Sequence, residues 1–157
     1  MPWKEKRKMM HRIKNMEESD IPKMLRFLEN AGKSHYREED LFRIIREMKF
    51  HGIVTETAKD IIGFMFLRMN RRASRIFDIY VAEGWRRKKI GTRMIRVLKE
   101  NRIDEIFMLV KETDVMMQLF LSSKNNRFKC IETVQGAFMV PVPLDNPSGQ
   151  EYKPIDG

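Results

Sequence analysis

The chain contains 157 residues, 42% of them hydrophobic and 34% charged, which suits one globular domain with its own core and matches no two-domain pattern. No apolar run approaches the ~20 residues that a membrane-spanning helix needs, and the basic opening segment lacks the apolar stretch of a secretory signal, so we expect a cytoplasmic protein. The net charge of +9 favours polyanionic partners, and the single cysteine excludes an internal disulfide.

The first third of the chain predicts one strand and two helices. Residues 9–16, after a basic arm at 1–8, alternate loosely between apolar and polar and predict a strand. Residues 17–20 then supply helix-starting side chains, and Pro22 is tolerated in a first turn. Two segments with apolar residues at i, i+3, i+4 and i+7, separated near Gly32, predict two amphipathic helices. The two sets are Ile21, Met24, Leu25 and Leu28, and then Leu41, Ile44, Ile45 and Met48.

A hairpin and a strand–helix unit are predicted in the middle of the chain. Two apolar runs separated by the charged pair at 59–60 predict the hairpin, and a turn then leads into a third strand and an amphipathic helix. The runs span 52–56 and 61–69, the turn 70–74 and the strand 75–81, and the helix buries Ile90, Met94, Val97 and Leu98 on one face.

The last part predicts a buried strand at 106–110, a helix that ends near Ser123, and a closing hairpin. Thr113 and Asp114 form an acceptable N-cap pair for the helix. The hairpin strands span 128–134 and 137–142. Residues 143–157 have little to bury, so we expect a mobile tail after a single domain at 1–142. The predicted order is β-α-α-β-β-β-α-β-α-β-β, an α/β fold of the α+β type with a mixed sheet.

The stretch Ile76–Glu100 joins a short apolar strand through a basic turn directly to an amphipathic helix. A helix N-terminus offers unpaired N–H groups and a partial positive charge, so this unit predicts a site for a phosphate-bearing cofactor. Full charges at Arg86, Arg87, Lys88 and Lys89 strengthen it. The basic clusters elsewhere, at 4–14 and 68–75, are either solvated surface or a site for nucleic acid or an acidic or ribosomal partner.

The same stretch resembles the acetyl-CoA-binding motif of the GNAT superfamily of N-acetyltransferases, in which the turn reads Arg or Gln, two variable residues, Gly, one variable residue, then Gly or Ala. Arg86 and Gly91 fit this pattern, and Lys89 stands where the first Gly belongs. A Cβ at Lys89 adds about 1–2 kcal/mol of strain if φ is positive there. The resemblance implies a GNAT-like fold over roughly residues 9–142 and acetyl-CoA as acyl donor. The residues it assigns to acetyl-CoA are Ile79, Val81, Arg86, Arg87, Lys88, Lys89, Ile90, Gly91, Thr92 and Asp114.

Transfer of an acetyl group to an amine needs a polarised carbonyl and a base. The resemblance implies that backbone N–H groups at the end of the Tyr80–Val81 strand polarise the carbonyl, at a bulge that also splays this strand from 106–110. Asp78 and Glu83 are the candidate bases for the amine. By strand alternation Asp78 lies alongside Ile76 and Tyr80 and opposite Phe77, Ile79 and Val81. The alternatives are that Asp78 pairs with an arginine such as Arg75 or caps an element, and that Glu83 is solvated.

The departing thiolate needs a proton, which the family commonly takes from a Tyr in the helix after the 106–110 strand. Asp114, Met117 and Leu121 stand where that family's Asn, Ala and Tyr belong. Leu121 cannot donate a proton, so either the thiolate leaves unaided or through water, or another residue such as Tyr80 takes over.

The function expected from these residues is an acetyl-CoA-dependent N-acetyltransferase that works by direct attack in a ternary complex. A protein or peptide amino group is the favoured acceptor, with small amines and aminoacyl-tRNA as alternatives. A second reading is a catalytically weak or inactive GNAT-like binding protein whose basic surface engages nucleic acid or an acidic partner. The three histidines are far apart in sequence, and no metal site is expected. Acyl chain length and oligomeric state, including a homodimer, stay open.

Overall fold

The computed structural model describes residues 10–70, 74–100, 106–110, 113–123, 126, 128–133 and 136–141. The predicted arm at 1–8 and tail at 143–157 lie outside these residues. The elements follow in the predicted order, with two short 3-10 turns added. They are β1 Arg12–Asn15, η1 Glu18–Asp20, α2 Ile21–Asn30, α3 Glu38–Arg46, β2 Phe50–Glu56, β3 Ile61–Arg68, β4 Ser74–Val81, η2 Glu83–Trp85, α4 Ile90–Glu100, β5 Ile106–Val110, α5 Val115–Ser122, β6 Phe128–Thr133 and β7 Gly136–Pro141.

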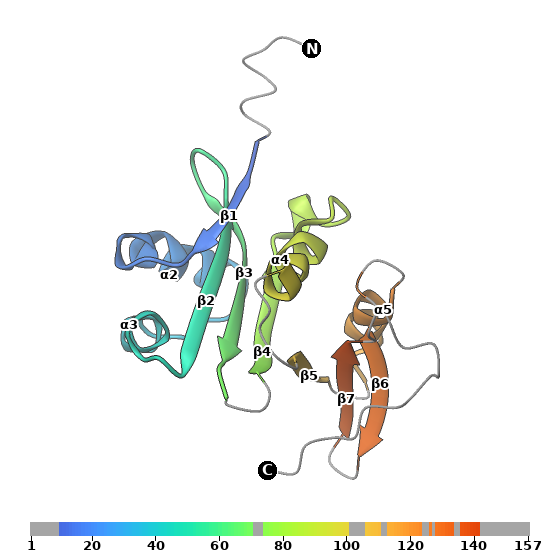
Figure 1. Ribbon diagram of the computed structural model, residues 1–157. Helices are drawn as coiled ribbons and strands as arrows, with labels where there is room; N and C mark the ends of the chain where they lie inside the picture. Colours follow the sequence, from blue (N-terminus) through green and yellow to red (C-terminus); the bar gives the residue numbers. More distant parts are fainter. Residues whose placement is uncertain are drawn as a thin grey trace, which may run out of the picture.

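The seven strands form one mixed sheet in the order β1-β2-β3-β4-β5-β7-β6 (Figure 1). β4 and β5 are parallel, and every other neighbouring pair is antiparallel. A parallel pair needs a crossover connection, and α4 lies in that connection. The predicted fold class and element order are therefore confirmed.

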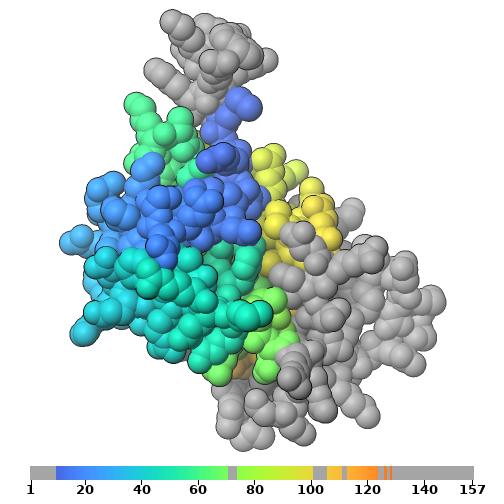
Figure 2. All heavy atoms as spheres, turned by 60° about the vertical axis from the view of Figure 1, so that its left-hand side comes forward, coloured from blue at the N-terminus to red at the C-terminus, as the bar shows by residue number. Residues whose placement is uncertain are grey.

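Helices cover both faces of the sheet, as the alternation within β2 and β3 requires. Val54, Phe64 and Phe66 pack with α2 and α3, whereas Ile53 and Met65 pack with α4. Because successive strand residues point to opposite faces, both cores draw on the same two strands. In Figure 2 the blue-to-cyan residues of α2 and α3 form a continuous covering over their face of the sheet.

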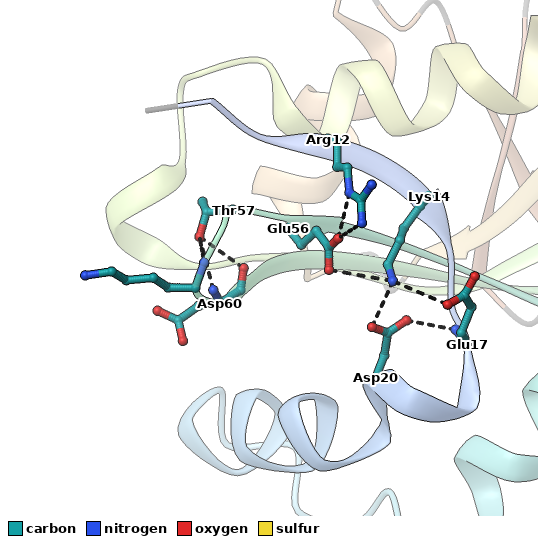
Figure 3. Close-up of polar contacts among 8 residues, drawn as sticks. Arg12, Lys14, Glu17, Asp20, Glu56, Thr57 and Asp60 are labelled. Carbon is teal, nitrogen blue, oxygen red and sulfur yellow. Dashed lines mark hydrogen bonds and ion pairs between the residues drawn. The ribbon is translucent and has the colours of Figure 1, made fainter. Parts of the chain in front are cut away.

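Charged side chains fasten β1 to the start of α2 and to β2 (Figure 3). The ammonium of Lys14 lies 2.9 Å from Asp20 Oδ1, and the guanidinium of Arg12 lies 2.7 Å from Glu56 Oε1. Asp20 Oδ2 also accepts the backbone N–H of Glu17 at 2.8 Å, which satisfies a donor at the helix entry. These contacts confirm that residues 17–20 start the first helix. Among the helices that the structure describes, none is both long enough and apolar enough to cross a membrane.

Candidate functional site

The centre of the sheet opens where β4 leaves β5. Within the described residues, β4 pairs with β5 at Ser74, Arg75 and Ile76, and the later part of β5 pairs with β7. β4 nevertheless continues to Val81 along β3. The predicted splaying of these two strands is confirmed, and the gap between them begins just after Ile76.

A bulge in β4 lies at the same place. Phe66 of β3 pairs with Asp78 and the next residue, Leu67, pairs with Ile76, so Phe77 is the extra residue of β4. The bulge was expected at Tyr80–Val81, and that position is wrong, since Tyr80 pairs regularly with its neighbour on β3. An inserted residue bends its strand, which accounts for the departure of β4 from β5 at this point.

The bulge also changes which side chains share a face of β4. Phe77 and Tyr80 both pack on the α2–α3 side, where Asp78 also lies, whereas Ile76 and Ile79 lie in the core beneath α4. The expectation that Ile76 lies alongside Asp78 and Phe77 opposite it is therefore wrong. Simple alternation fails here because the extra residue shifts the face by one position.

Two backbone N–H groups of β4 face the gap. The N–H of Ala82 donates to the Ile62 carbonyl on β3 at 2.8 Å, and the pairing from Asp78 to Val81 is regular. N–H groups alternate in direction along a strand, so those of Ile79 and Val81 point away from β3. They point toward the side on which β5 has turned away.

The basic turn closes the far end of this gap. Arg86 Nε donates to the Val81 carbonyl at 3.0 Å, and its guanidinium lies 5.2 Å from the centre of the Tyr80 ring. Arg87 and Lys89 have φ values of 64° and 63°, in the left-handed region that favours glycine. Lys89 therefore adopts the backbone conformation that explains a glycine at this position of the motif.

The first turn of α4 follows directly and is well packed. Ile90, Gly91 and Thr92 are buried, and the N–H groups of a first helical turn have no partner within the helix. A Cβ on Gly91 would lie 2.8 Å from Cζ of Phe120 on α5, closer than packed atoms come. An alanine at this position would require the Phe120 ring to shift, so Gly91 allows the close contact between the two helices. The unpaired N–H groups and the exposed Arg87, Lys88 and Lys89 make this end of α4 suitable for phosphate.

Asp78 is held by two side chains from the loop between α2 and α3. Lys33 Nζ lies 3.1 Å and 3.2 Å from its two carboxylate oxygens, and the Tyr36 hydroxyl donates to Oδ2 at 2.7 Å. Lys33, rather than an arginine such as Arg75, is its ionic partner. A carboxylate offers about four lone-pair positions, so three contacts leave one on Oδ1. That position can bind a water or an amine.

Tyr36 and Lys33 are site residues that sequence reasoning missed. Burial, followed by the hydrogen bond to Asp78 and its charge, raises the pKa of the Tyr36 phenol well above the usual range. Tyr36 therefore stays protonated and acts as a donor to the carboxylate. The contact joins residues 42 positions apart, and nothing in the local pattern around Tyr36 points to a strand so distant.

The two other predicted catalytic residues lie in different surroundings. The Tyr80 ring packs edge-on against Phe27, at 5.8 Å between ring centres, and Lys33 Nζ lies 5.6 Å from the ring centre. Glu83 begins η2 and is exposed. The structure thus brings Tyr80 close to the Asp78 group, while Glu83 lies in the solvated loop after β4.

The helix α5 carries the last two positions singled out by the sequence. Asp114 is its N-cap, as predicted, and Oδ1 accepts the N–H of Met117 at 3.1 Å. Leu121 is completely buried in the core beneath α4. Its side chain therefore has a packing role and presents no proton donor.

Comparison with known proteins supports one family. A model described as the acetyltransferase (GNAT) family matches residues 12–116. The PaiA N-acetyltransferase of Thermoplasma acidophilum, solved in complex with coenzyme A, has a similar structure, with a TM-score of 0.66, 16% identity, and coverage of 84% of this chain and 98% of that chain. The ribosomal-protein-S18-alanine N-acetyltransferase of Escherichia coli is also similar in structure, with a TM-score of 0.65 and 16% identity. The match covers 92% of this chain and 100% of that chain.

An aminoglycoside acetyltransferase from an uncultured soil metagenomic sample, in complex with sisomicin, gives a TM-score of 0.65 at 18% identity and covers 79% of this chain and 91% of that chain. At these identities the likeness shows a shared fold. No curated protein sequence matches significantly.

Proposed function

The chain belongs to the acetyltransferase (GNAT) family, and from this we propose that it transfers an acetyl group from acetyl-CoA to an amine, with a protein or peptide amino group as acceptor. The observation that carries the proposal is the gap between β4 and β5, which has two outward N–H groups on one side and the N-terminus of α4 at its end. This combination suits a long ligand with a carbonyl at one end and phosphates at the other.

The residues fit acetyl-CoA in two parts. The first turn of α4 and the side chains of Arg87, Lys88 and Lys89 would hold the phosphates. The N–H groups of Ile79 and Val81 would hold the arm and polarise the carbonyl in the gap. When bound, acetyl-CoA supplies an acetyl group activated as a thioester. The N–C bond forms as the C–S bond breaks, and the proton lost by the amine balances the one that the thiolate gains.

We assign the proton of the amine to Asp78, which lies on β4 beyond its last described pair with β5. The remaining position on Asp78 Oδ1 receives it, directly or through a water, while Tyr36 and Lys33 fix the orientation of the carboxylate. An α-amino group has a pKa of about 7.7–8.0 and so needs only a weak base. This supports an α-amino acceptor over a lysine side chain.

The proton for the thiolate is assigned to Tyr80, because Leu121 presents only hydrocarbon. Tyr80 lies beyond the last β4–β5 pair and beside Arg86. Replacement of Tyr80 by Phe should lower kcat while leaving the dissociation constant of acetyl-CoA within about twofold. An unchanged kcat would mean that the thiolate leaves without this residue.

Isothermal titration tests the donor site. We expect saturable binding of acetyl-CoA and CoA, and the proposal fails if neither binds below about millimolar. Lys88→Glu should weaken binding at least about tenfold, since reversal of a charge beside a phosphate removes a charge-assisted contact. Arg96→Glu is the matched control, because Arg96 is also exposed but lies about 9 Å further along α4. It should change affinity by about twofold or less.

A further inference from the structure

A hollow of about 350 Å³ lies between α3 and the sheet, on the face of β4 that carries Asp78. Its walls come from the loop before α3, from α3 itself, from the first residue of β2 and from the bulge of β4. α3 and the start of β2, in cyan to teal, adjoin light-green residues near the start of β4 in Figure 2. The volume is at the low end of the range of about 300–1,000 Å³ for small-molecule sites.

Two contacts connect this hollow to the proposed site of acetyl transfer. Phe77 lines the hollow, and it is also the bulge residue that follows the last described β4–β5 pair. Tyr36 lines the hollow as well, and its hydroxyl donates to Asp78 at 2.7 Å. A group that fills the hollow therefore contacts the bulge residue of β4 and the side chain that donates to the carboxylate.

The lining is mostly apolar in character. Ile44, Phe50 and Phe77 and the ring of Tyr36 form most of its walls, and His35, whose ring centre lies 4.3 Å from that of Tyr36, also lines it. Both charged side chains in the lining already have partners in the protein. Asp40 Oδ2 accepts the N–H of Arg37 at 2.8 Å, and Arg43 Nε pairs with Glu47 at 3.4 Å. Water inside such a space makes few hydrogen bonds, so an apolar group displaces it favourably.

We propose that this hollow takes the apolar side group next to the acceptor amine, so that the chain prefers amines attached to a medium-sized aliphatic or aromatic group. The first residue of a peptide that begins with Met, Leu or Phe has this chemistry, and so does a small amine such as 2-phenylethylamine. The inference rests on the proposed function and narrows its acceptor. A polyhydroxylated amine would leave the apolar walls without matching contacts.

The test compares peptides that differ only at the first residue. We expect kcat/KM for Met, Leu and Phe peptides to exceed that of Ser, Gly and Asp peptides by at least about tenfold, the scale of a single apolar pocket. The turnover of 2-phenylethylamine distinguishes a small-amine acceptor from a peptide acceptor. An enzyme that acts on peptides should acetylate this amine more slowly than it acetylates the Leu peptide. Equal kcat/KM across the peptides, or faster turnover of sisomicin, would overturn the inference.

Variants link the preference to the hollow. Phe50→Ala should reduce the ratio of Leu-peptide to Ser-peptide kcat/KM several-fold, and Phe50→Leu should reduce it less. Met48→Ala is the control, since Met48 is 96% exposed and does not line the hollow. Acetyl-CoA affinity, measured by titration, should stay within about twofold in all three variants. A ratio that Phe50→Ala leaves unchanged contradicts the proposal.

The two proposals fail differently. Loss of acetyl-CoA binding, or acetylation of no amine at all, removes the proposed function and this inference with it. Normal acetyl-CoA binding with equal turnover of Leu and Ser peptides removes the inference alone.

Discussion

Lys89 offers a direct test of the strain in the turn before α4. Its φ of 63° places a residue with a Cβ in the left-handed region. The adjacent lysine, Lys88, is not among the described non-glycine residues that have a positive φ. Both side chains are exposed. The comparison is between Ala and Gly at each of the two positions, because Ala keeps the Cβ and both replacements remove the charge and the long side chain.

Two contributions to stability act in opposite directions when Ala is replaced by Gly at position 89. Relief of a left-handed conformation is worth about 1–2 kcal/mol, and the extra freedom that Gly gives the unfolded chain costs about 0.4–1 kcal/mol. Lys89→Gly should therefore be more stable than Lys89→Ala by about 0.8 kcal/mol. Lys88→Gly should be less stable than Lys88→Ala by about 0.4–1 kcal/mol, because no strain is relieved there.

Thermal and urea unfolding of the four variants measure these differences. The stability change from Ala to Gly at position 89, minus the same change at position 88, equals the backbone strain energy of about 1–2 kcal/mol. This corresponds to about 2–8 °C in Tm for a chain of this size. If the change from Ala to Gly is equally destabilising at both positions, Lys89 does not hold the left-handed conformation in solution. Titration with acetyl-CoA should also show tighter binding by Lys89→Gly than by Lys89→Ala, since Gly lets the backbone approach a phosphate.

Three other outcomes are expected. The change that Gly91→Ala makes in the free energy of unfolding should be more stabilising, by at least about 1 kcal/mol, in a Phe120→Ala background than in the native chain. Additive effects in this double-mutant cycle would show that the two residues do not touch. Asp114→Ala should cost about 0.5–2 kcal/mol of stability through loss of the α5 cap, whereas Asp114→Asn keeps the cap, and equal losses would refute this role. Burial lowers the pKa of His51 from its ordinary 6.5, so the unfolded chain takes up the proton more readily and stability should fall as pH drops below about 6.5. His51→Gln should flatten this dependence in unfolding curves between pH 5 and 7, and an unaltered slope would contradict it.

The sequence predicted the elements well because their signals are local. The spacing from Ile21 to Leu28 identifies α2, and the acidic run before Leu41 marks the start of α3. The basic turn before α4 was also evident, since a cluster of charges between a strand and a helix needs no knowledge of the rest of the fold. The bulge at Phe77 has no such signal, because no glycine marks it and the register of β3 alone determines it.

The site was predicted less completely because it joins distant segments. Asp78 was identified as a candidate, but its partner Lys33 lies 45 residues away. Their contact depends on how the loop after α2 folds over the sheet, which periodicity does not encode. The face on which Asp78 lies followed from the bulge, so one missed backbone irregularity altered the predicted neighbours of the central carboxylate.

The narrow contact between β4 and β5 has a mechanical consequence. Three described parallel pairs join the two strands, while longer antiparallel ladders hold β2 to β3 and β3 to β4 on one side. The sheet therefore consists of two parts, β1 to β4 and β5 to β7, that are joined by a short stretch of parallel pairing. Parallel pairing is slightly less stable per residue than antiparallel pairing. A ligand that binds across the gap stabilises the pairing of β4 with β5. When the ligand is in excess over Kd, the free energy needed to separate these strands rises with the logarithm of its concentration divided by Kd. Without ligand, amides at the three β4–β5 pairs should exchange faster than those in the middle of β3, and acetyl-CoA should slow exchange at these pairs. Equal exchange rates at both places without ligand would mean that the two parts of the sheet open together.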